Sequence, residues 1–184
     1  MASWFNTRKA AQVVAFFAGK QGGSIPVLKL AKLIYIADRM NMGKYDYPIS
    51  GDRLVSMDHG PVNSITLNLI NGLSLDKREW DEFVSDRADH EVAAKRHFAN
   101  EDLDELSDAD VATLEEVWAA FGHMGKYAIR DWTHKHCPEW EDPNGSSNPI
   151  PYERVFKFLG KDNAEELAER VESERALRAA LSNA

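Results

Sequence analysis

Residues 27–42, VLKLAKLIYIADRMNM, constrain the fold more than any other segment of the chain. At 100° per residue, apolar side chains cover most of the circumference of a helix built from this segment. The remaining arc holds Ile36 and three basic residues, Lys29, Lys32 and Arg39. A helix that is apolar nearly all round needs neighbours on most of its sides. The segment therefore predicts a central helix with one basic edge.

Glycine and proline set the boundaries expected for this helix. It follows Ser24, tolerates Pro26 in its first turn and ends at Gly43, since proline suits a first helical turn and glycine a helix end. The same signals, with apolar side chains at helical spacing, predict helices elsewhere. Their expected ranges are 7–21, 61–71, 108–121 behind a capping box at 107–110, 126–136, 151–160 and 164–181.

Short extended segments interrupt these helices. Residues 53–57 predict a short strand, and residues 79–84 and 91–94 could pair as a small hairpin, although a helix suits 93–96 equally. The expected fold class is mainly α: a single compact helical domain of about six to seven helices with a small β hairpin or short strands. We expect this domain to span residues 1–160, and the charged, alanine-rich residues 161–184 to form a helical C-terminal appendage.

Charge and composition narrow the classes of function. The net charge of −8 argues against a dedicated nucleic-acid binder, although residues 1–60 carry a net +4 that could serve an acidic partner. No stretch approaches the roughly 20 apolar residues of a membrane span, so we expect no membrane association. Cys137 is the only cysteine, which excludes an internal disulfide and a cysteine-based metal site. A lone thiol suits the reducing cytoplasm, where we expect the protein to act.

Asp38 breaks the pattern of the central helix, because it falls on the apolar side. An unpaired buried carboxylate is very costly, so Asp38 needs partners. Arg53, His59 and the free amides of the helix expected after Pro61 are available for this role. We interpret this group, together with Tyr35, as a structural polar network that pins a loop to the helix. The alternative is a catalytic carboxylate or a ligand pocket.

A second polar group lies within residues 131–137, DWTHKHC. Asp131 and His134 are three positions apart on the expected helix and can touch, so they could form an acid–base pair or, in our preferred interpretation, part of the structural network. His134 and His136 point about 200° apart on that helix, so one metal ion cannot easily use both, and we expect no metal site. A nucleophilic Cys137 would need an adjacent base, so a buried thiol is the better interpretation.

Five segments carry a resemblance to a known family. In chain order they read VLKLAKLIYIADR, YPISGDRLVSMDHGPV, LSDAD, RDWTHKHCPEW and NPIPYE. Their order and spacing, over roughly residues 7–160, resemble the Panacea domain of SocA-like antitoxins, and this resemblance implies a mostly helical domain with minor β-structure. The positions that match the family include Lys29, Lys32, Tyr35, Asp38, His59, Gly60, Pro61, Val62, Thr133, His134, Pro138 and Trp140.

The resemblance implies an antitoxin that neutralises a toxin by direct protein–protein contact. Some members of the family act as adaptors that hand the toxin to a AAA+ protease, which implies a second partner. We expect a non-enzymatic protein without a cofactor. The alternative is a small hydrolase, or an enzyme that reverses toxin damage, using Asp38 with His59 or Asp131 with His134. We predict the binding surface at the basic edge and the turn that follows, at Lys29, Lys32, Arg39, His59, Gly60, Pro61 and Val62.

Overall fold

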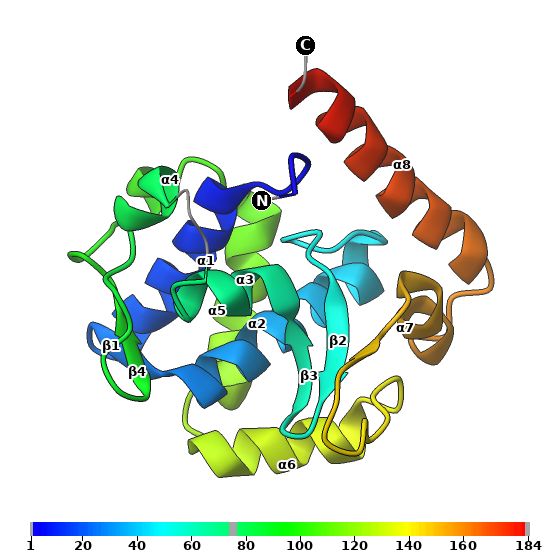
Figure 1. The fold of residues 1–184 in the computed structure, drawn as a ribbon, viewed down its shortest axis with the longest axis horizontal. Helices are drawn as coiled ribbons and strands as arrows, with labels where there is room; N and C mark the ends of the chain where they lie inside the picture. Colours follow the sequence, from blue (N-terminus) through cyan, green and yellow to red (C-terminus); the bar gives the residue numbers. More distant parts are fainter. Residues whose placement is uncertain (1, 74–76, 183–184) are drawn as a thin grey trace.

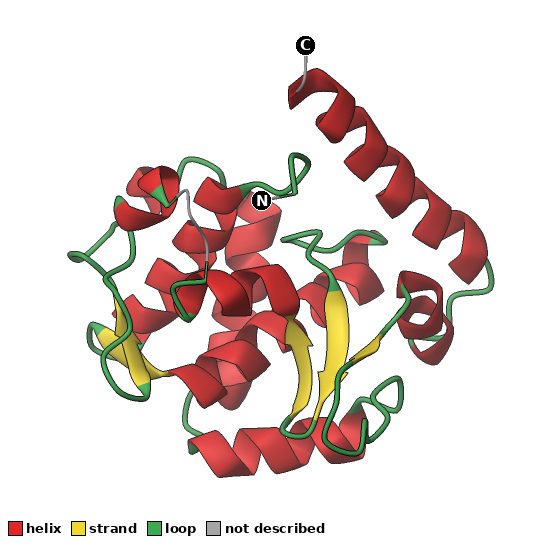
Figure 2. Cartoon of the chain, viewed as in Figure 1, coloured by secondary structure: helices red, strands yellow, loops and turns green. Residues whose placement is uncertain are grey.

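The computed structural model describes residues 2–73 and 77–182 of the 184-residue chain. Within these ranges the chain forms eight α-helices, one short 3₁₀ helix and five short strands, so the expected mainly α class is confirmed (Figures 1 and 2). In chain order the elements are α1 (Thr7–Lys20), β1 (Ser24–Pro26), α2 (Val27–Tyr45), β2 (Leu54–Met57), β3 (Gly60–Asn63), α3 (Ser64–Ile70), α4 (Arg78–Asp81), β4 (Glu91–Ala93), η1 (Asn100–Asp102), α5 (Asp108–Phe121), α6 (Lys126–His136), β5 (Asn148–Pro149), α7 (Tyr152–Phe158) and α8 (Ala164–Ser182).

Helix α2 is the centre of the fold, as its sequence predicts. It packs against α1, α5, α6 and β3, and 13 of its 19 residues are buried (Figure 1). Its predicted ends are wrong. Residues before Val27 are extended because they pair with β4, and the helix runs through Gly43 to a left-handed residue, Asp46, whose N–H donates to the carbonyl of Met42. Tertiary pairing therefore sets the start of α2, and a backbone cap sets its end.

Residues 60–63 form a strand rather than the start of the expected third helix. β3 pairs antiparallel with β2, and β5 pairs with the other edge of β2. The helix begins only at Ser64, where the carboxylate of Asp52 accepts hydrogen bonds from the N–H groups of Ile65 and Thr66 at 2.9 and 2.8 Å. A carboxylate from a distant loop thus caps α3, a signal that the local sequence does not carry.

The expected hairpin between residues 79–84 and 91–94 forms only in part. Residues 78–81 form the short helix α4, while Val84 and Ala94 share an antiparallel bridge and the N–H of Lys95 donates to the carbonyl of Phe83 at 2.8 Å. The strand β4 pairs as a ladder with β1, far earlier in the chain, with Ile25 opposite Val92. Strand pairing at long range cannot be read from the two short apolar runs alone, because either run fits several partners.

Two clusters of buried side chains make up the core. The larger cluster joins α1, α2 and α5 with side chains from α3, α4 and β4. The smaller cluster joins Tyr35 and Met42 of α2 to α7 and to the first half of α8. The helix α8 contributes Ala164, Leu167 and Val171 to this second cluster. The predicted domain boundary at residue 160 stays a prediction, although the start of α8 shares this core.

Arg175 fastens α8 to the body of the protein. Its guanidinium donates to the carbonyl of Gly51 from Nε (3.1 Å) and Nη2 (2.9 Å), and to the carbonyl of Asp52 from Nη2 (2.7 Å). It also lies over the rings of Trp4 and Tyr152, 4.4 and 4.8 Å from their centroids. Beyond this point Leu177 and Leu181 are exposed, and the last turn of α8 meets the body at Ser182, whose hydroxyl donates to the carbonyl of Ser3 at 2.8 Å (Figure 1). The anchor therefore divides α8 into a packed half and an exposed half.

Replacing Arg175 with alanine removes these carbonyl contacts and both ring contacts. We expect Arg175→Ala to lower the free energy of unfolding by about 2 kcal/mol, because part-buried carbonyls lose a charged donor. Urea denaturation measures the change. Arg170→Ala is the matched control, because Arg170 is an exposed arginine on the same helix. Equal unfolding midpoints for the two variants would show that the anchor contributes nothing to stability.

Candidate functional site: a groove between α2 and the β2–β3 hairpin

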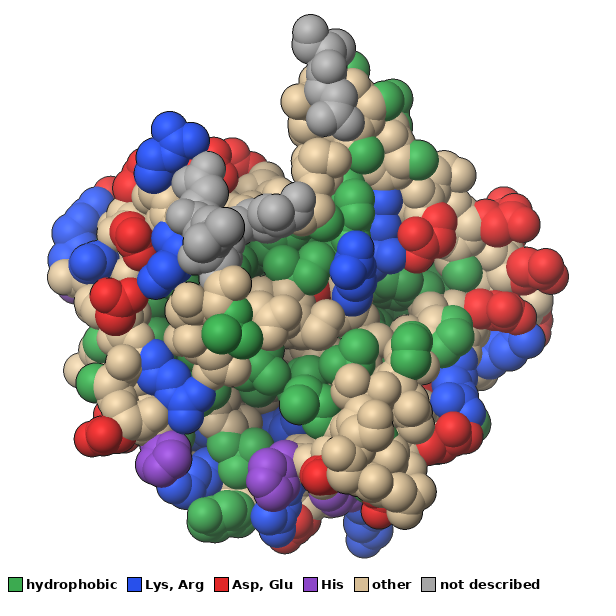
Figure 3. All heavy atoms as spheres, in the orientation of Figure 1, with side chains coloured by type: hydrophobic (Ala, Val, Ile, Leu, Met, Phe, Trp, Pro, Cys, Tyr) green, Lys and Arg blue, Asp and Glu red, His purple; other side chains and the backbone are tan. Residues whose placement is uncertain are grey.

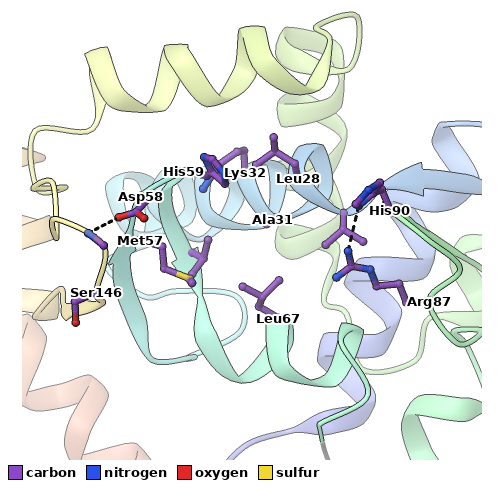
Figure 4. A pocket seen from close by; sticks show the side chains of 13 residues that line it. Leu28, Ala31, Lys32, Met57, Asp58, His59, Leu67, Arg87, His90 and Ser146 are labelled. Carbon is purple, nitrogen blue, oxygen red and sulfur yellow. Dashed lines mark hydrogen bonds between the residues drawn. The ribbon is translucent and has the colours of Figure 1, made fainter.

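A groove of about 370 Å³ opens between α2, the β2–β3 hairpin and α3 (Figure 4). Its walls are apolar: Val27, Leu28 and Ala31 come from α2, Val62 from β3 and Leu67 from α3. On the face drawn in Figure 3, hydrophobic side chains gather over the hairpin and α3, while Asp and Glu side chains lie mainly towards the edges. Because α2 is apolar on nearly all sides, some of its side chains form one wall of the groove while others pack into the core. A cavity of this size and lining is typical of binding sites in proteins.

Ionisable side chains lie at the two ends of the groove, with the apolar walls between them (Figure 4). Asp58 and His59 lie at the hairpin end, where Asp58 Oδ1 accepts a hydrogen bond of 3.0 Å from the N–H of Gly145. Arg87 and His90 lie at the opposite end, with Arg87 Nη2 3.4 Å from Nδ1 of His90. The groove therefore has an apolar middle and polar ends.

Lys32 reaches the groove from α2. Its side chain is fully buried, and Nζ donates a 2.8 Å hydrogen bond to the carbonyl of Pro61 on β3. Burial lowers the pKa of Lys32 from 10.5 to about 7, because the charged ammonium loses its hydration. Within residues 2–73 and 77–182, no carboxylate pairs with this amine. Lys32 thus joins β3 to the central helix without a counter-ion.

The sequence predicts that the basic edge of α2 is part of a binding surface, but its cations are turned into the protein. Lys29 is 5% exposed, and its Nζ donates to Gln21 Oε1 at 2.6 Å and to the carbonyl of Gly122 at 2.7 Å. Arg39 forms an ion pair with the buried Glu139 at 2.7 Å. Long basic side chains can bury their stems and satisfy their ends on backbone oxygens, which periodicity alone does not reveal.

The turn that leads into β3 fits closely against α6. Gly60 has a φ of +96°, and a Cβ at this position would lie 3.0 Å from Thr133 Oγ1 and 3.1 Å from the ring of His134. Pro61 and Val62 are buried behind it, whereas His59 is exposed at the mouth of the groove. Glycine is needed here both for the left-handed backbone and for the close approach. Of the residues predicted to bind a partner, Lys32, His59 and Val62 line the groove.

Asp38 lies at the centre of a buried network, with partners other than those we expected. Its carboxylate accepts from Ser50 N (2.9 Å), Ser50 Oγ (2.5 Å) and Asn63 Nδ2 (2.7 Å). Burial raises the pKa of Asp38, and these hydrogen bonds oppose that rise. Arg53 instead lies 5.8 Å from the centroid of the Trp4 ring, and His59 lies at the groove. The network joins α2 to the loop before β2 and to the end of β3.

Asp52 extends this network to α3 and was not singled out by the sequence. Besides the two N–H groups that it caps, it accepts from Thr66 Oγ1 at 2.7 Å. Burial raises the pKa of Asp52 to about 6. Asp52, Ser50 and Asn63 could have been suspected only from the turn-rich composition of the loop, since small polar residues there commonly bond backbone and carboxylate groups.

Tyr35 belongs to a separate group around Glu139. Its hydroxyl donates to Glu139 Oε1 at 2.7 Å, next to the ion pair of Arg39 with the same carboxylate. Burial, together with the Glu139 charge, raises the pKa of Tyr35. Cys137 lies nearby, and burial raises the pKa of its thiol to about 12. A thiol so hard to ionise is a poor nucleophile.

The structure does not bring Asp131 and His134 into a hydrogen bond. Asp131 pairs with Arg130 at 2.6 Å, and the ring of His134 stacks on Trp140 with centroids 4.1 Å apart. Burial lowers the pKa of His134, and its Nε2 has no hydrogen-bond partner in the described part of the chain. Trp140 Nε1 donates at 2.9 Å to the carbonyl of Met57 in the hairpin. These residues hold the hairpin against α6.

Comparisons with known proteins give one match. The family described as "Antitoxin SocA-like, Panacea domain" matches residues 30–141, a range that includes β2, β3, α3 and most of α2. No curated protein and no solved structure matches the chain. Within residues 2–73 and 77–182, no group of three or more His, Cys, Asp or Glu side chains is placed to hold a metal ion, and no helix is long and apolar enough to cross a membrane.

The buried amine of Lys32 links stability to pH. Its pKa is about 7 in the folded protein and close to 10.5 in the unfolded chain, so between these values the unfolded state binds one more proton. The free energy of unfolding therefore gains up to about 1.4 kcal/mol per pH unit from this group as pH rises from 7 towards 10.

Urea denaturation at pH 7, 8 and 9 tests this dependence. We expect the free energy of unfolding of the wild type, minus that of Lys32→Met, to rise with pH. Lys95→Met, which removes an exposed lysine, controls for the loss of one positive charge. If the difference in the free energy of unfolding between the wild type and Lys32→Met stays constant with pH, the pKa of Lys32 is not lowered in the folded protein.

Proposed function

The chain belongs to the family of SocA-like antitoxins with a Panacea domain, and we propose that it neutralises the toxin of a toxin–antitoxin pair by direct protein–protein binding. The family match carries the antitoxin role, because it covers residues 30–141 and therefore most of the groove. We further propose that the groove between α2 and the hairpin is the surface that contacts the toxin. We also propose that it acts in the cytoplasm, because a lone thiol such as Cys137 suits a reducing compartment.

The surroundings of the candidate catalytic groups support a function in protein binding rather than in catalysis. The carboxylates of Asp38 and Asp52 are buried and already accept several hydrogen bonds each. Asp131 and His134 have different partners, and ionisation of Cys137 is disfavoured. A general base must reach a substrate proton, and of the candidate groups only His59 faces the groove. Its expected partner, Asp38, bonds Ser50 and Asn63 instead. An apolar groove with a few polar groups is instead suited to holding a partner.

The stoichiometry of neutralisation tests the proposal. The protein is purified with the toxic product of the adjacent reading frame, and toxin activity is titrated against it. A binding antitoxin coelutes with the toxin and abolishes activity at a fixed molar ratio. Complete neutralisation by far less than one equivalent would contradict binding and favour the alternative enzyme, with Asp38 and His59 or Asp131 and His134 as its candidate residues. His134→Ala is assayed for both toxin binding and neutralisation. Loss of neutralisation with toxin binding retained would favour the enzyme.

Delivery of the bound toxin to a AAA+ protease is a finer proposal, supported by the exposed half of α8. Leu177 and Leu181 on this half are 59% and 69% exposed and lie beyond the Arg175 anchor. Deleting residues 176–184 keeps the anchor and the buried side chains of α8. We expect the truncated protein still to neutralise the toxin, while the half-life of the toxin in cells lengthens severalfold. An unchanged half-life would exclude delivery through this segment.

A further inference from the structure

The charge of the groove is opposite to that of the chain. The chain has a net charge of −8 with histidine counted as neutral. On the same count the groove is lined by two basic side chains, Lys32 and Arg87, and by Asp58 as the one acidic side chain, with His59 and His90 beside them. A surface whose charge opposes that of the whole molecule selects partners by complementary charge.

Arg87 is an exposed cation of the groove, and it has no carboxylate partner in the described part of the chain, whereas Lys32 is buried on the carbonyl of Pro61. Its Nε donates at 2.7 Å to the carbonyl of Asp89, Nη1 donates to Asn71 Oδ1, and Nη2 lies against the ring of His90. The carboxylate of Asp58, at the other end, already accepts the N–H of Gly145. The positive charge of Arg87 is therefore not neutralised by an ion pair within residues 2–73 and 77–182, which leaves it available to an incoming anion.

The middle of the groove favours large apolar side chains. Leu28 and Ala31 of α2 and Leu67 of α3 line it there, and Met57 lies at the hairpin end with 36% of its surface exposed (Figure 4). Methionine adapts its shape to different partners, which suits a surface that must pack against an irregular chain. The apolar walls lie between the basic end at Arg87 and His90 and the end that holds His59.

From this arrangement we propose that the groove receives a segment of the toxin in which large apolar side chains are flanked by carboxylates. The apolar side chains fill the space between α2 and α3. One flanking carboxylate pairs with Arg87, and the other meets His59. This inference rests on the proposed function, because it names the chemistry of the partner that the antitoxin binds.

Synthetic peptides test the proposed chemistry with the full-length protein. The first peptide has 15 residues, with leucines and phenylalanines in the middle and glutamates on both sides. The second replaces the glutamates with lysines, and the third replaces the apolar residues with serines. Fluorescence anisotropy of labelled peptides measures binding. We expect the first peptide to bind at least about tenfold more tightly than either of the others, with affinity that falls as salt rises. Equal binding of the acidic and basic peptides, or no binding of the acidic one, overturns the proposal.

Variants of the groove locate the binding. Arg87→Glu is expected to weaken the acidic peptide about tenfold or more, because it places like charges together. Met57→Asp should weaken it by placing a carboxylate at the apolar hairpin end. Arg170→Glu makes the same charge change on exposed α8 and should leave binding unaltered. Circular dichroism and urea midpoints confirm that each variant folds. An equal loss in Arg87→Glu and Arg170→Glu would mean that net charge, not the groove, attracts the peptide.

The same variants in the toxin titration separate this inference from the proposed function. If the wild type neutralises the toxin and folded Arg87→Glu and Met57→Asp do so equally well, the groove is not the contact surface, while the antitoxin role stands. If the wild type does not bind the toxin at all, the antitoxin role fails. If both variants lose neutralisation while Arg170→Glu keeps it, the groove chemistry and the function are supported together.

Discussion

The burial of α2 on nearly every side is the constraint on which the rest of this structure depends. A helix with so little exposed surface has to satisfy its polar side chains within the protein, and those of α2 do so on several elements. Asp38 bonds the loop before β2 and the end of β3, Lys32 bonds β3, and Lys29 bonds the end of α5. The polar groups of one helix thereby position the hairpin that forms the other side of the groove.

The sequence predicts much of the fold because most of its signals are local. The apolar pattern of α2, the capping box at Ser107 and the glycine after α5 need no information from distant residues. The failures lie where distant residues decide. Pro61 suits the first turn of a helix, but pairing with β2 holds it in a strand, and β4 takes β1 as its partner. Such pairings depend on contacts that no local window contains.

The candidate site was predicted in part, and for a physical reason. The turn before β3 and the buried carboxylate of Asp38 stand out in the sequence, because glycine next to proline and an acid on an apolar face are both unusual. The sequence predicts that the lysines of α2 lie at the surface, since charge usually marks exposure. Their carbonyl partners on Pro61 and Gly122 come from the tertiary structure. Arg87 and His90 gave no signal, because exposed basic residues in a loop are common.

The close fit of Gly60 against α6 has a consequence for how events in the groove can be observed. Since the turn has no spare room beside Thr133 and His134, a movement of the hairpin must be accompanied by one of α6. Trp140 lies across this contact, with its indole N–H on the hairpin and its ring stacked on His134. Trp140, one of five tryptophans in the chain, is therefore positioned so that its emission changes when something enters the groove.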